Sequence, residues 1–382
     1  MKPQVPWVMG VATFLVAASL VSVRNSSATL PLLGDPEDTT DPYQEELRAA
    51  EVSRAKDPAW KPTSTETGVI QVGGGKSPGI LKNFSLDAEG NVLACVAPPP
   101  ESGSPGIRVY SPEGTLLRTL PLKIRPGAID VAPDGSIYVA GSGMLLLLDA
   151  SGRELASAAS PVVDLPVAIS GELEEFIQES ARETRRPPEE VRKEMLENLE
   201  RRRAEVTGLA VSGEDVFLAV PTPDEFTYRV YRFGPGLSNP QLVVEKLRGC
   251  CGQMDIQALA GELWISHNAR HTVERRDRDG KLVAKFGKAG KVRPADFGGC
   301  CEPKNLCVLS GDELLVAESG PPTCIKRFSA DGRFIEVVAI LKGKGECVRV
   351  SVAASPDGRR FYLMDTAADA IRIYTNERSS PE

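Results

Sequence analysis

Two pairs of adjacent cysteines, each preceded by a glycine, stand out in the sequence. Cys250 and Cys251 lie in the stretch RGCCGQMD, and Cys300 and Cys301 lie in GGCCEPKNLC, which ends at Cys307. Adjacent Cα atoms are about 3.8 Å apart, below the roughly 4.4–6.8 Å of an ordinary disulfide, so a bridge within either pair would be strained. Thiolates also bind zinc or copper, and several together can hold an iron–sulfur cluster. The pairs therefore raise disulfide, metal and redox chemistry as alternatives.

The other candidate ligands are few. The chain has eight cysteines and two histidines, and those outside the two pairs and Cys307 are Cys95, Cys324, Cys347, His267 and His271. No Cys-x-x-Cys or Cys-x-x-Cys-His motif occurs, so neither a zinc knuckle nor haem attachment is indicated. Two histidines cannot make a three-histidine zinc site, and no Ser-His-Asp motif appears.

An internal repeat supplies the elements that must position these residues. From about Gly68 a unit of four short strands joined by Gly-containing turns recurs six times, as in APDGSIYVAG, SGDELLVAESGPPTCIKRFSADGRF and SPDGRRFYLMDTAADAIRIY. A period of roughly 40 residues with four strands is typical of a β-propeller. The last copy lacks its fourth strand, and Thr67–Gly73 (TGVIQVG) can supply it and remove the open edges. We predict an all-β, six-bladed propeller over residues 67–378, closed by this N-terminal strand and followed by a tail at 379–382.

These repeats resemble those of NHL-repeat six-bladed propellers over residues 67–378. The Gly-Cys-Cys stretches are also similar to those of uncharacterised exported bacterial members of that group. The resemblance implies the fold but selects no activity, because such propellers serve as enzymes, sensors and interaction platforms.

The N-terminal region outside the repeat has two parts. Residues 1–28 contain an apolar run from Trp7 to Val23 followed by small residues, the layout of a secretory signal peptide. The run reaches the lower limit of about 17–25 residues for a membrane span, so an uncleaved anchor through residues 7–23 is the alternative. Residues 29–66 are rich in proline and charge, and they predict a linker with one short helix around Tyr43–Ala55.

A second departure from the repeat lies between the second and third blades. Residues 171–204 have apolar side chains at helical spacing on both sides of Pro187-Pro188, and proline suits the first turn of a helix. We predict a helical hairpin insertion here. It is either a solvated hairpin packed on the rim or a lid or arm that binds a partner.

Strand alternation places all eight cysteines and both histidines in the same half of the propeller, toward the face that we call the top face. In each blade the loop leading into the inner strand and the loop between the second and third strands lie on this side. Cys250 and Cys251 precede the inner strand of blade four, Cys300 and Cys301 that of blade five, and Cys347 that of blade six. The blade-four top loop SHNARH holds both histidines. Glu318 and Asp365 occupy the aligned positions of blades five and six.

Three functions remain open from the sequence. The first is a soft-metal or redox-linked ligand site at the top of the channel, with zinc, copper or an iron–sulfur cluster as the candidate cofactors. Its candidate cofactor-binding residues are Cys250, Cys251, Cys300, Cys301, Cys307 and Cys347, and its candidate metal ligands are Cys250, Cys251, Cys300, Cys301, Cys347, His267, His271, Glu318 and Asp365. The second is a protein-interaction platform without metal, stapled by disulfides. The third is a metal-dependent hydrolase or lyase, as in the related lactonases and peptide-amidating lyases.

Charge and composition limit the partners. The chain carries a net charge of −7, and its 35 glycines and 30 prolines favour many short elements joined by turns. Removal of residues 1–28 takes away two basic residues and no acidic one, so a nucleic-acid partner is not expected. We expect an exported monomer, periplasmic or extracellular or held at a membrane, that binds a protein or a small molecule at the top face. An exported chain with an even number of cysteines also favours disulfides.

Overall fold

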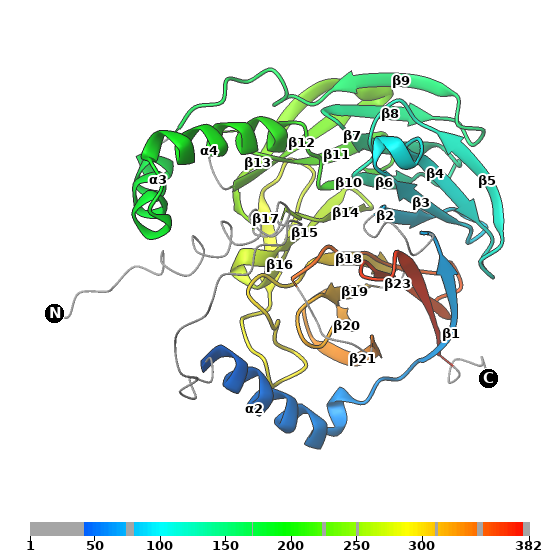
Figure 1. Ribbon diagram of the computed structural model, residues 1–382. Helices are drawn as coiled ribbons and strands as arrows, with labels where there is room; N and C mark the ends of the chain where they lie inside the picture. Colours follow the sequence, from blue (N-terminus) through cyan, green and yellow to red (C-terminus); the bar gives the residue numbers. More distant parts are fainter. Residues whose placement is uncertain are drawn as a thin grey trace.

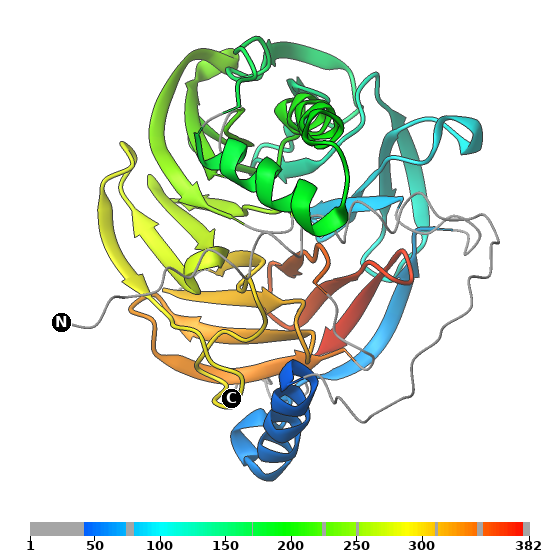
Figure 2. The ribbon, with the colours of Figure 1, turned by 60° about the vertical axis from the view of Figure 1, so that its left-hand side comes forward.

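Six four-stranded antiparallel sheets are arranged around a central axis in the computed structural model (Figures 1 and 2). The structure describes residues 42–73, 80–169, 171–223, 227–249, 252–309, 312–341 and 347–376. The prediction of an all-β six-bladed propeller is confirmed. The predicted signal peptide or anchor and the predicted tail lie outside the described residues.

Each of the first five blades is a meander of four consecutive strands. Blade one contains β2 (Leu81–Leu86), β3 (Val92–Val96), β4 (Gly106–Tyr110) and β5 (Leu116–Pro121). Blade two contains β6 (Ala128–Val131), β7 (Ile137–Gly141), β8 (Met144–Leu148) and β9 (Glu154–Ala159). Blade three contains β10 (Gly208–Ser212), β11 (Asp215–Pro221), β12 (Thr227–Gly234) and β13 (Ser238–Arg248). Blade four contains β14 (Ile256–Leu259), β15 (Glu262–His267), β16 (Thr272–Arg276) and β17 (Leu282–Phe286). Blade five contains β18 (Asn305–Leu309), β19 (Glu313–Glu318), β20 (Cys324–Ser329) and β21 (Phe334–Ile340).

The sixth blade combines the two ends of the repeat region. It contains β22 (Val352–Ala354), β23 (Arg360–Asp365), β24 (Ala370–Thr375) and, as its outer strand, β1 (Thr65–Gln71). The pairing is antiparallel and sets Ile70 opposite Ile371. The predicted closing strand is therefore present, and it begins two residues earlier than expected.

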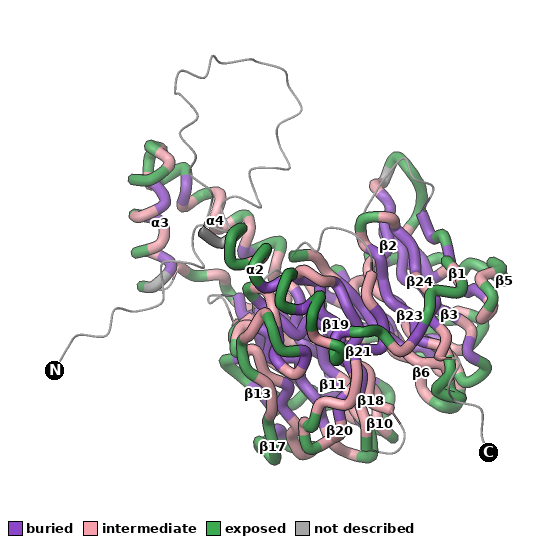
Figure 3. The backbone as a smooth tube through the Cα atoms, turned by 90° about the horizontal axis from the view of Figure 1, so that it is seen from below, coloured by how far each residue is buried: buried purple, intermediate pink, exposed green. Residues whose placement is uncertain are grey.

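Apolar side chains hold neighbouring blades together. Leu93 and Ile107 of blade one pack with Val139 of blade two, and Trp264 of blade four packs with Leu306 of blade five. Every residue of β3 is buried, as expected for a strand covered on both faces. Figure 3 shows the buried segments concentrated in the strands of the ring. Each blade thus depends on both of its neighbours.

Polar side chains link the inner strands directly. A carboxylate oxygen of Asp130 accepts a 2.8 Å hydrogen bond from the backbone N–H of Val211, which joins blades two and three. Asp255 accepts one of 2.9 Å from the N–H of Leu306, which joins blades four and five. Asn305 makes the same kind of contact with blade six. These bonds satisfy backbone donors that line the centre of the ring.

Three α-helices accompany the sheets among the residues that the structure describes. They are α2 (Pro42–Lys56), α3 (Gly171–Thr184) and α4 (Pro188–Arg203), and the short 3₁₀ turns are η1 (Pro58–Trp60), η2 (Pro100–Ser102), η3 (Pro235–Leu237) and η4 (Asn268–Arg270). The segment predicted as a hairpin contains α3 and α4, and they pack through Ile177, Ala181 and Val191. Figures 1 and 3 show α3 standing out from the ring. In the described part of the chain, no helix is both long and apolar enough to span a bilayer.

Burial of Asp130 makes the stability of the ring dependent on pH. Burial raises the pKa of Asp130 to about 6, against about 3.9 for an unperturbed aspartate. Between these values the folded state keeps a proton that the unfolded state has lost. The free energy of unfolding of the wild type should therefore fall, relative to that of Asp130→Asn, as the pH rises from about 4.5 to about 7. Urea unfolding of both proteins at several pH values measures this difference.

The exposed Asp134, in a turn of the same blade, provides the control. Hydrogen bonds from Ser136 lower the pKa of Asp134, so its contribution is lost only at more acidic pH. Asp134→Asn should show no trend over the same range. A difference between wild type and Asp130→Asn that does not change with pH would contradict the assignment.

Candidate functional site

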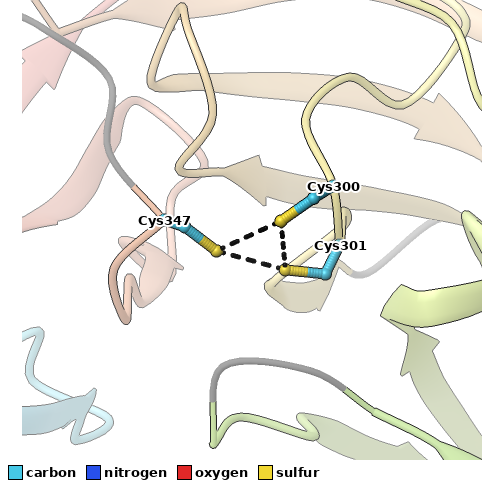
Figure 4. A group of neighbouring side chains, drawn as sticks. All are labelled: Cys300, Cys301 and Cys347. Carbon is cyan, nitrogen blue, oxygen red and sulfur yellow. Dashed lines mark hydrogen bonds between the residues drawn. The ribbon is translucent and has the colours of Figure 1, made fainter. Parts of the chain in front are cut away.

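Three cysteine sulfurs meet where blades five and six adjoin (Figure 4). Cys300 and Cys301 come from the loop that leads into β18, and Cys347 comes from the loop that leads into β22. The Sγ of Cys301 is 3.2 Å from that of Cys300 and 3.2 Å from that of Cys347, and the remaining separation is 3.5 Å. These separations exceed the roughly 2.05 Å of a disulfide bond, so the three sulfurs are not bridged to one another. We call them the sulfur cluster.

The sulfur cluster has a buried side and an exposed side. Cys301 is fully buried, whereas Cys300 and Cys347 are exposed. Among the described residues, these three form the one group of three or more cysteine, histidine or acidic side chains with ligand atoms close enough to share an ion. An ion held here would be anchored by Cys301 and reachable from the side of the other two sulfurs.

A buried lysine lies against the cluster. Lys304 Nζ is 2.8 Å from the Sγ of Cys301 and 3.3 Å from that of Cys347, and its side chain is 0% exposed. Fully buried ammonium groups are rare and require polar or negative partners, which the two sulfurs and the nearby Glu302 carboxyl supply here. Sequence reasoning missed Lys304. Its position three residues after the second cysteine pair, just before an inner strand, was the available signal.

Glu302 ties the cysteine loop to the top of blade five. One carboxylate oxygen, Oε1, accepts hydrogen bonds from the N–H of Ser319 (3.0 Å), its hydroxyl (2.8 Å) and the N–H of Gly320 (2.7 Å). Burial raises the pKa of Glu302 well above its usual range, and the charge of Lys304 acts in the opposite direction. Because Glu302 directly follows Cys301, these bonds hold the loop that presents the sulfurs.

The glycines before the two cysteine pairs are required by close packing. Gly299 has a φ of +68°, and a Cβ there would lie 3.1 Å from Cγ of Glu302. A Cβ on Gly249 would overlap the ring of Tyr228. The positive φ at Gly299 agrees with the role in backbone conformation that the sequence suggests. At Gly249 the reason is the lack of space beside the aromatic ring.

The predicted ligand His267 lies outside the sulfur cluster and is occupied elsewhere. Its Nε2 accepts a 3.0 Å hydrogen bond from the N–H of Arg248, and its Nδ1 lies 2.7 Å from Oε1 of Glu274. The proton therefore sits on Nδ1 and is donated to the carboxylate. With both ring nitrogens engaged, His267 acts as a structural link between blades three and four.

The two predicted acidic ligands also have other partners. Glu318 forms an ion pair with the buried Lys326 and accepts a 2.7 Å hydrogen bond from the N–H of Gly298. Asp365 pairs with Arg372 at 2.7 Å on its own blade. Their positions at the ends of β19 and β23 agree with the predicted alignment, but the structure does not bring them into the sulfur cluster.

The remaining candidates are not members of the sulfur cluster as the structure describes it. His271 is partly buried, and burial lowers its pKa while the charges of Glu318 and Cys300 act in the opposite direction. Cys307 lies in β18 outside the cluster, and burial raises its pKa to about 11. Cys250 and Cys251 fall outside the described residues, so the predicted meeting of the two pairs stays a prediction.

A chamber of about 1190 Å³ opens beside the sulfur cluster. One wall is formed by α2, η1 and the following residue, and the other by loops of blades five and six. The blade side includes Gly299, Cys300, Glu302, Gly320, Pro321, Pro322, Ile340 and Cys347. The exposed sulfurs thus face a half-open pocket, whose volume is larger than the roughly 300–1,000 Å³ typical of small-molecule sites.

The helical wall of the chamber binds to the segment that connects blade four to blade five. Arg54 Nη1 donates a 2.6 Å hydrogen bond to the carbonyl of Lys291, and Trp60 Nε1 donates one of 2.6 Å to the carbonyl of Val292. Lys291 in turn pairs with Glu46 at 2.8 Å. The sequence indicated a linker with a short helix here. Residues 42–66 instead pack on the propeller, because one buried tryptophan and one buried arginine anchor them.

Comparisons with known proteins add the following. No family model matches the sequence, and no curated protein sequence matches it. Among solved structures, the chain is similar to a streptogramin B lyase (11% identity, TM-score 0.48) and to a gluconolactonase from Xanthomonas campestris (12% identity, TM-score 0.49), each covering 84% of this chain and 99% of the other. It is also similar to the Pan2 WD40 domain of Neurospora crassa (8% identity, TM-score 0.46, 85% of this chain and 99% of that one). With every TM-score under 0.5, this likeness carries nothing about activity.

The class of the protein follows from its own strands and side chains. It is a six-bladed β-propeller with a three-cysteine cluster at one junction between blades. The helix α2 lies beside the cluster and forms one wall of the chamber.

The chamber wall should loosen when its tryptophan anchor is removed. Trp60 packs against Cys324 and Val337 and is 7% exposed. Trp60→Ala should lower the free energy of local opening of residues 42–60 by about 3–5 kcal/mol, as is usual for a buried tryptophan. Hydrogen–deuterium exchange of α2 measures this. Val52→Ala, on an exposed face of the same helix, should leave exchange unchanged, and equal effects of both variants would contradict the anchoring role.

Proposed function

We propose that this chain is an exported, NHL-like propeller that binds a soft metal ion through Cys300, Cys301 and Cys347. The observation that carries the proposal is the convergence of three sulfurs from two separate loops. The apolar run from Trp7 to Val23 supports export, with attachment to a membrane if that run is retained. The bound ion would supply a soft Lewis-acid or redox centre at the top face.

Charge balance supports a divalent ion. Three thiolates and a divalent ion together carry one negative charge, and the ammonium of Lys304 offsets it within the buried half of the site. Zinc prefers thiolate ligands at about 2.3 Å, and small movements of sulfurs already 3.2–3.5 Å apart would accommodate it. Cys250 and Cys251 remain candidates for further ligation.

A second candidate is a disulfide-stapled interaction platform. The observation that favours it is the 3.2 Å separation between the sulfurs of Cys301 and Cys347, which a small shift would bring to bonding distance. Such a bridge would staple blade five to blade six and leave α3, α4 and the top face for a protein partner. Export to an oxidising compartment favours this alternative.

Free-thiol counting with elemental analysis distinguishes the two candidates. On protein purified without reductant, metal binding predicts stoichiometric zinc or copper and thiols that react only after chelation. The platform predicts little metal and a disulfide between Cys301 and Cys347 found by peptide mapping. Reactive thiols with neither metal nor disulfide would contradict both.

Substitution of single cysteines should separate ligands from bystanders. Cys301→Ser should weaken zinc binding by about 100-fold or more, because a hydroxyl is a poor ligand for a soft ion. Cys307→Ser, in the neighbouring strand, is the matched control and should retain the affinity of the wild type. Competition with a chromophoric chelator gives both values. Equal affinities for the two variants would exclude Cys301 as a ligand.

Lys304 should be required for tight binding of a divalent ion. Lys304→Met keeps the length of the side chain and removes its charge, so zinc affinity should fall by about tenfold or more as the thiolates lose their counter-charge. Lys193→Met, near the first turn of α4 and outside the chamber lining, should have no effect. Unchanged zinc affinity in Lys304→Met would show that the ammonium does not stabilise the bound state.

A further inference from the structure

The chamber beside the sulfur cluster has the features of a ligand site. Its volume of about 1190 Å³ greatly exceeds that of a few waters, and two exposed cysteines, Cys300 and Cys347, line it directly. An ion bound to these sulfurs would therefore have one side facing the chamber. Zinc sites that do more than stabilise a fold keep a coordination position for an outside molecule, and they can expand to five ligands.

The lining of the chamber is mixed in a way that suits a small organic anion. Apolar surface comes from Leu47 on α2 and from Pro321, Pro322 and Ile340 on blade five. The exposed cations Arg48 and Lys61 lie on the helical side. Such a wall can cover a short carbon chain and offer cations to a carboxylate.

Three acidic residues line the chamber, and two of them are committed to the protein itself, whereas the third, Glu51 on α2, is exposed. Asp57 accepts a 2.9 Å hydrogen bond from the N–H of Ala59 and so caps η1. Oε1 of Glu302 accepts three hydrogen bonds from the β19–β20 loop. Among the exposed charged residues of the lining, the cations Arg48, Lys56 and Lys61 outnumber Glu51, so the helical side keeps a net positive charge.

We propose that the chamber binds a small thiol-bearing carboxylate, whose sulfur coordinates the ion held by the sulfur cluster. The inference rests on the proposed metal-binding function and names the class of ligand for the same site. Coordination replaces solvent on the chamber side of the ion, and the thiol releases its proton to water. The carboxylate lies toward Arg48 and Lys61, and the carbon chain packs between α2 and blade five.

The test uses the full chain loaded with Co²⁺, which reports thiolate coordination through its charge-transfer absorption. 3-Mercaptopropionate should shift this absorption and should bind about tenfold more tightly than neutral 2-mercaptoethanol. A tenfold difference in affinity corresponds to about 1.4 kcal/mol of binding free energy. Propionate, which lacks the thiol, should leave the spectrum unchanged. Cobalt is measured after desalting, so that removal of the ion by the thiol is distinguished from binding and counts against the inference.

Matched variants locate the binding to the chamber. Leu47→Trp fills the space from α2 and should weaken 3-mercaptopropionate binding by about tenfold, whereas Val52→Trp, on the exposed face of the same helix, should not. Replacing Arg48 and Lys61 together by glutamate should remove the preference for the anionic thiol and leave 2-mercaptoethanol binding unchanged.

The outcomes separate the two levels of the proposal. Absence of thiolate-to-cobalt absorption in the wild type overturns the proposed metal function, and the inference with it. Normal cobalt loading with no spectral response to 3-mercaptopropionate overturns only the inference. A response that is the same in Leu47→Trp and in Val52→Trp also overturns it, because the thiol would then reach the ion by another route.

Discussion

The pairing of β1 with β24 is the constraint on which the rest of the structure depends. It joins a strand from the beginning of the repeat region to one from its end, so the sixth blade reaches four strands only when both ends of the region meet. It also fixes where the preceding chain must pass. Because β1 forms the outside of blade six, α2 and η1 lie within reach of the adjoining blade five, and the chamber forms between them.

The site combines groups that would be unfavourable in isolation. A fully buried lysine, a buried carboxyl and a buried cysteine occupy one short stretch, from Cys301 to Lys304. Each is offset by the others or by the β19–β20 loop: the ammonium by sulfurs, and the carboxyl by three donors. These buried groups keep their positions only while the groups that offset them stay in place. The cysteine loop is therefore held more firmly than its exposed cysteines suggest.

The sequence was sufficient for the architecture and for part of the site. Repeat period, strand alternation and the missing fourth strand predicted six blades, their order and the closing strand, because each depends on local patterns. Alternation also placed Cys301 and Cys347 on neighbouring loops. It could not select among the other candidates, since the partners that occupy His267 and Asp365 are chosen by side-chain packing in three dimensions. The role of α2 was missed for the same reason: a charged, proline-flanked segment resembles a linker until its anchors are seen.

The fastening of α2 has a mechanical consequence. Tension applied to the N-terminal end of the chain would reach the contacts of Arg54 and Trp60 before it reached the ladder between β1 and β24. The contacts of Arg54 and Trp60 are few and would break one after another, whereas the hydrogen bonds between β1 and β24 would bear the force together. A pull from the N-terminus would therefore remove the helical wall beside Cys300 and Cys347 while the ring stayed closed, so that the chamber opens at a lower force than the propeller unfolds.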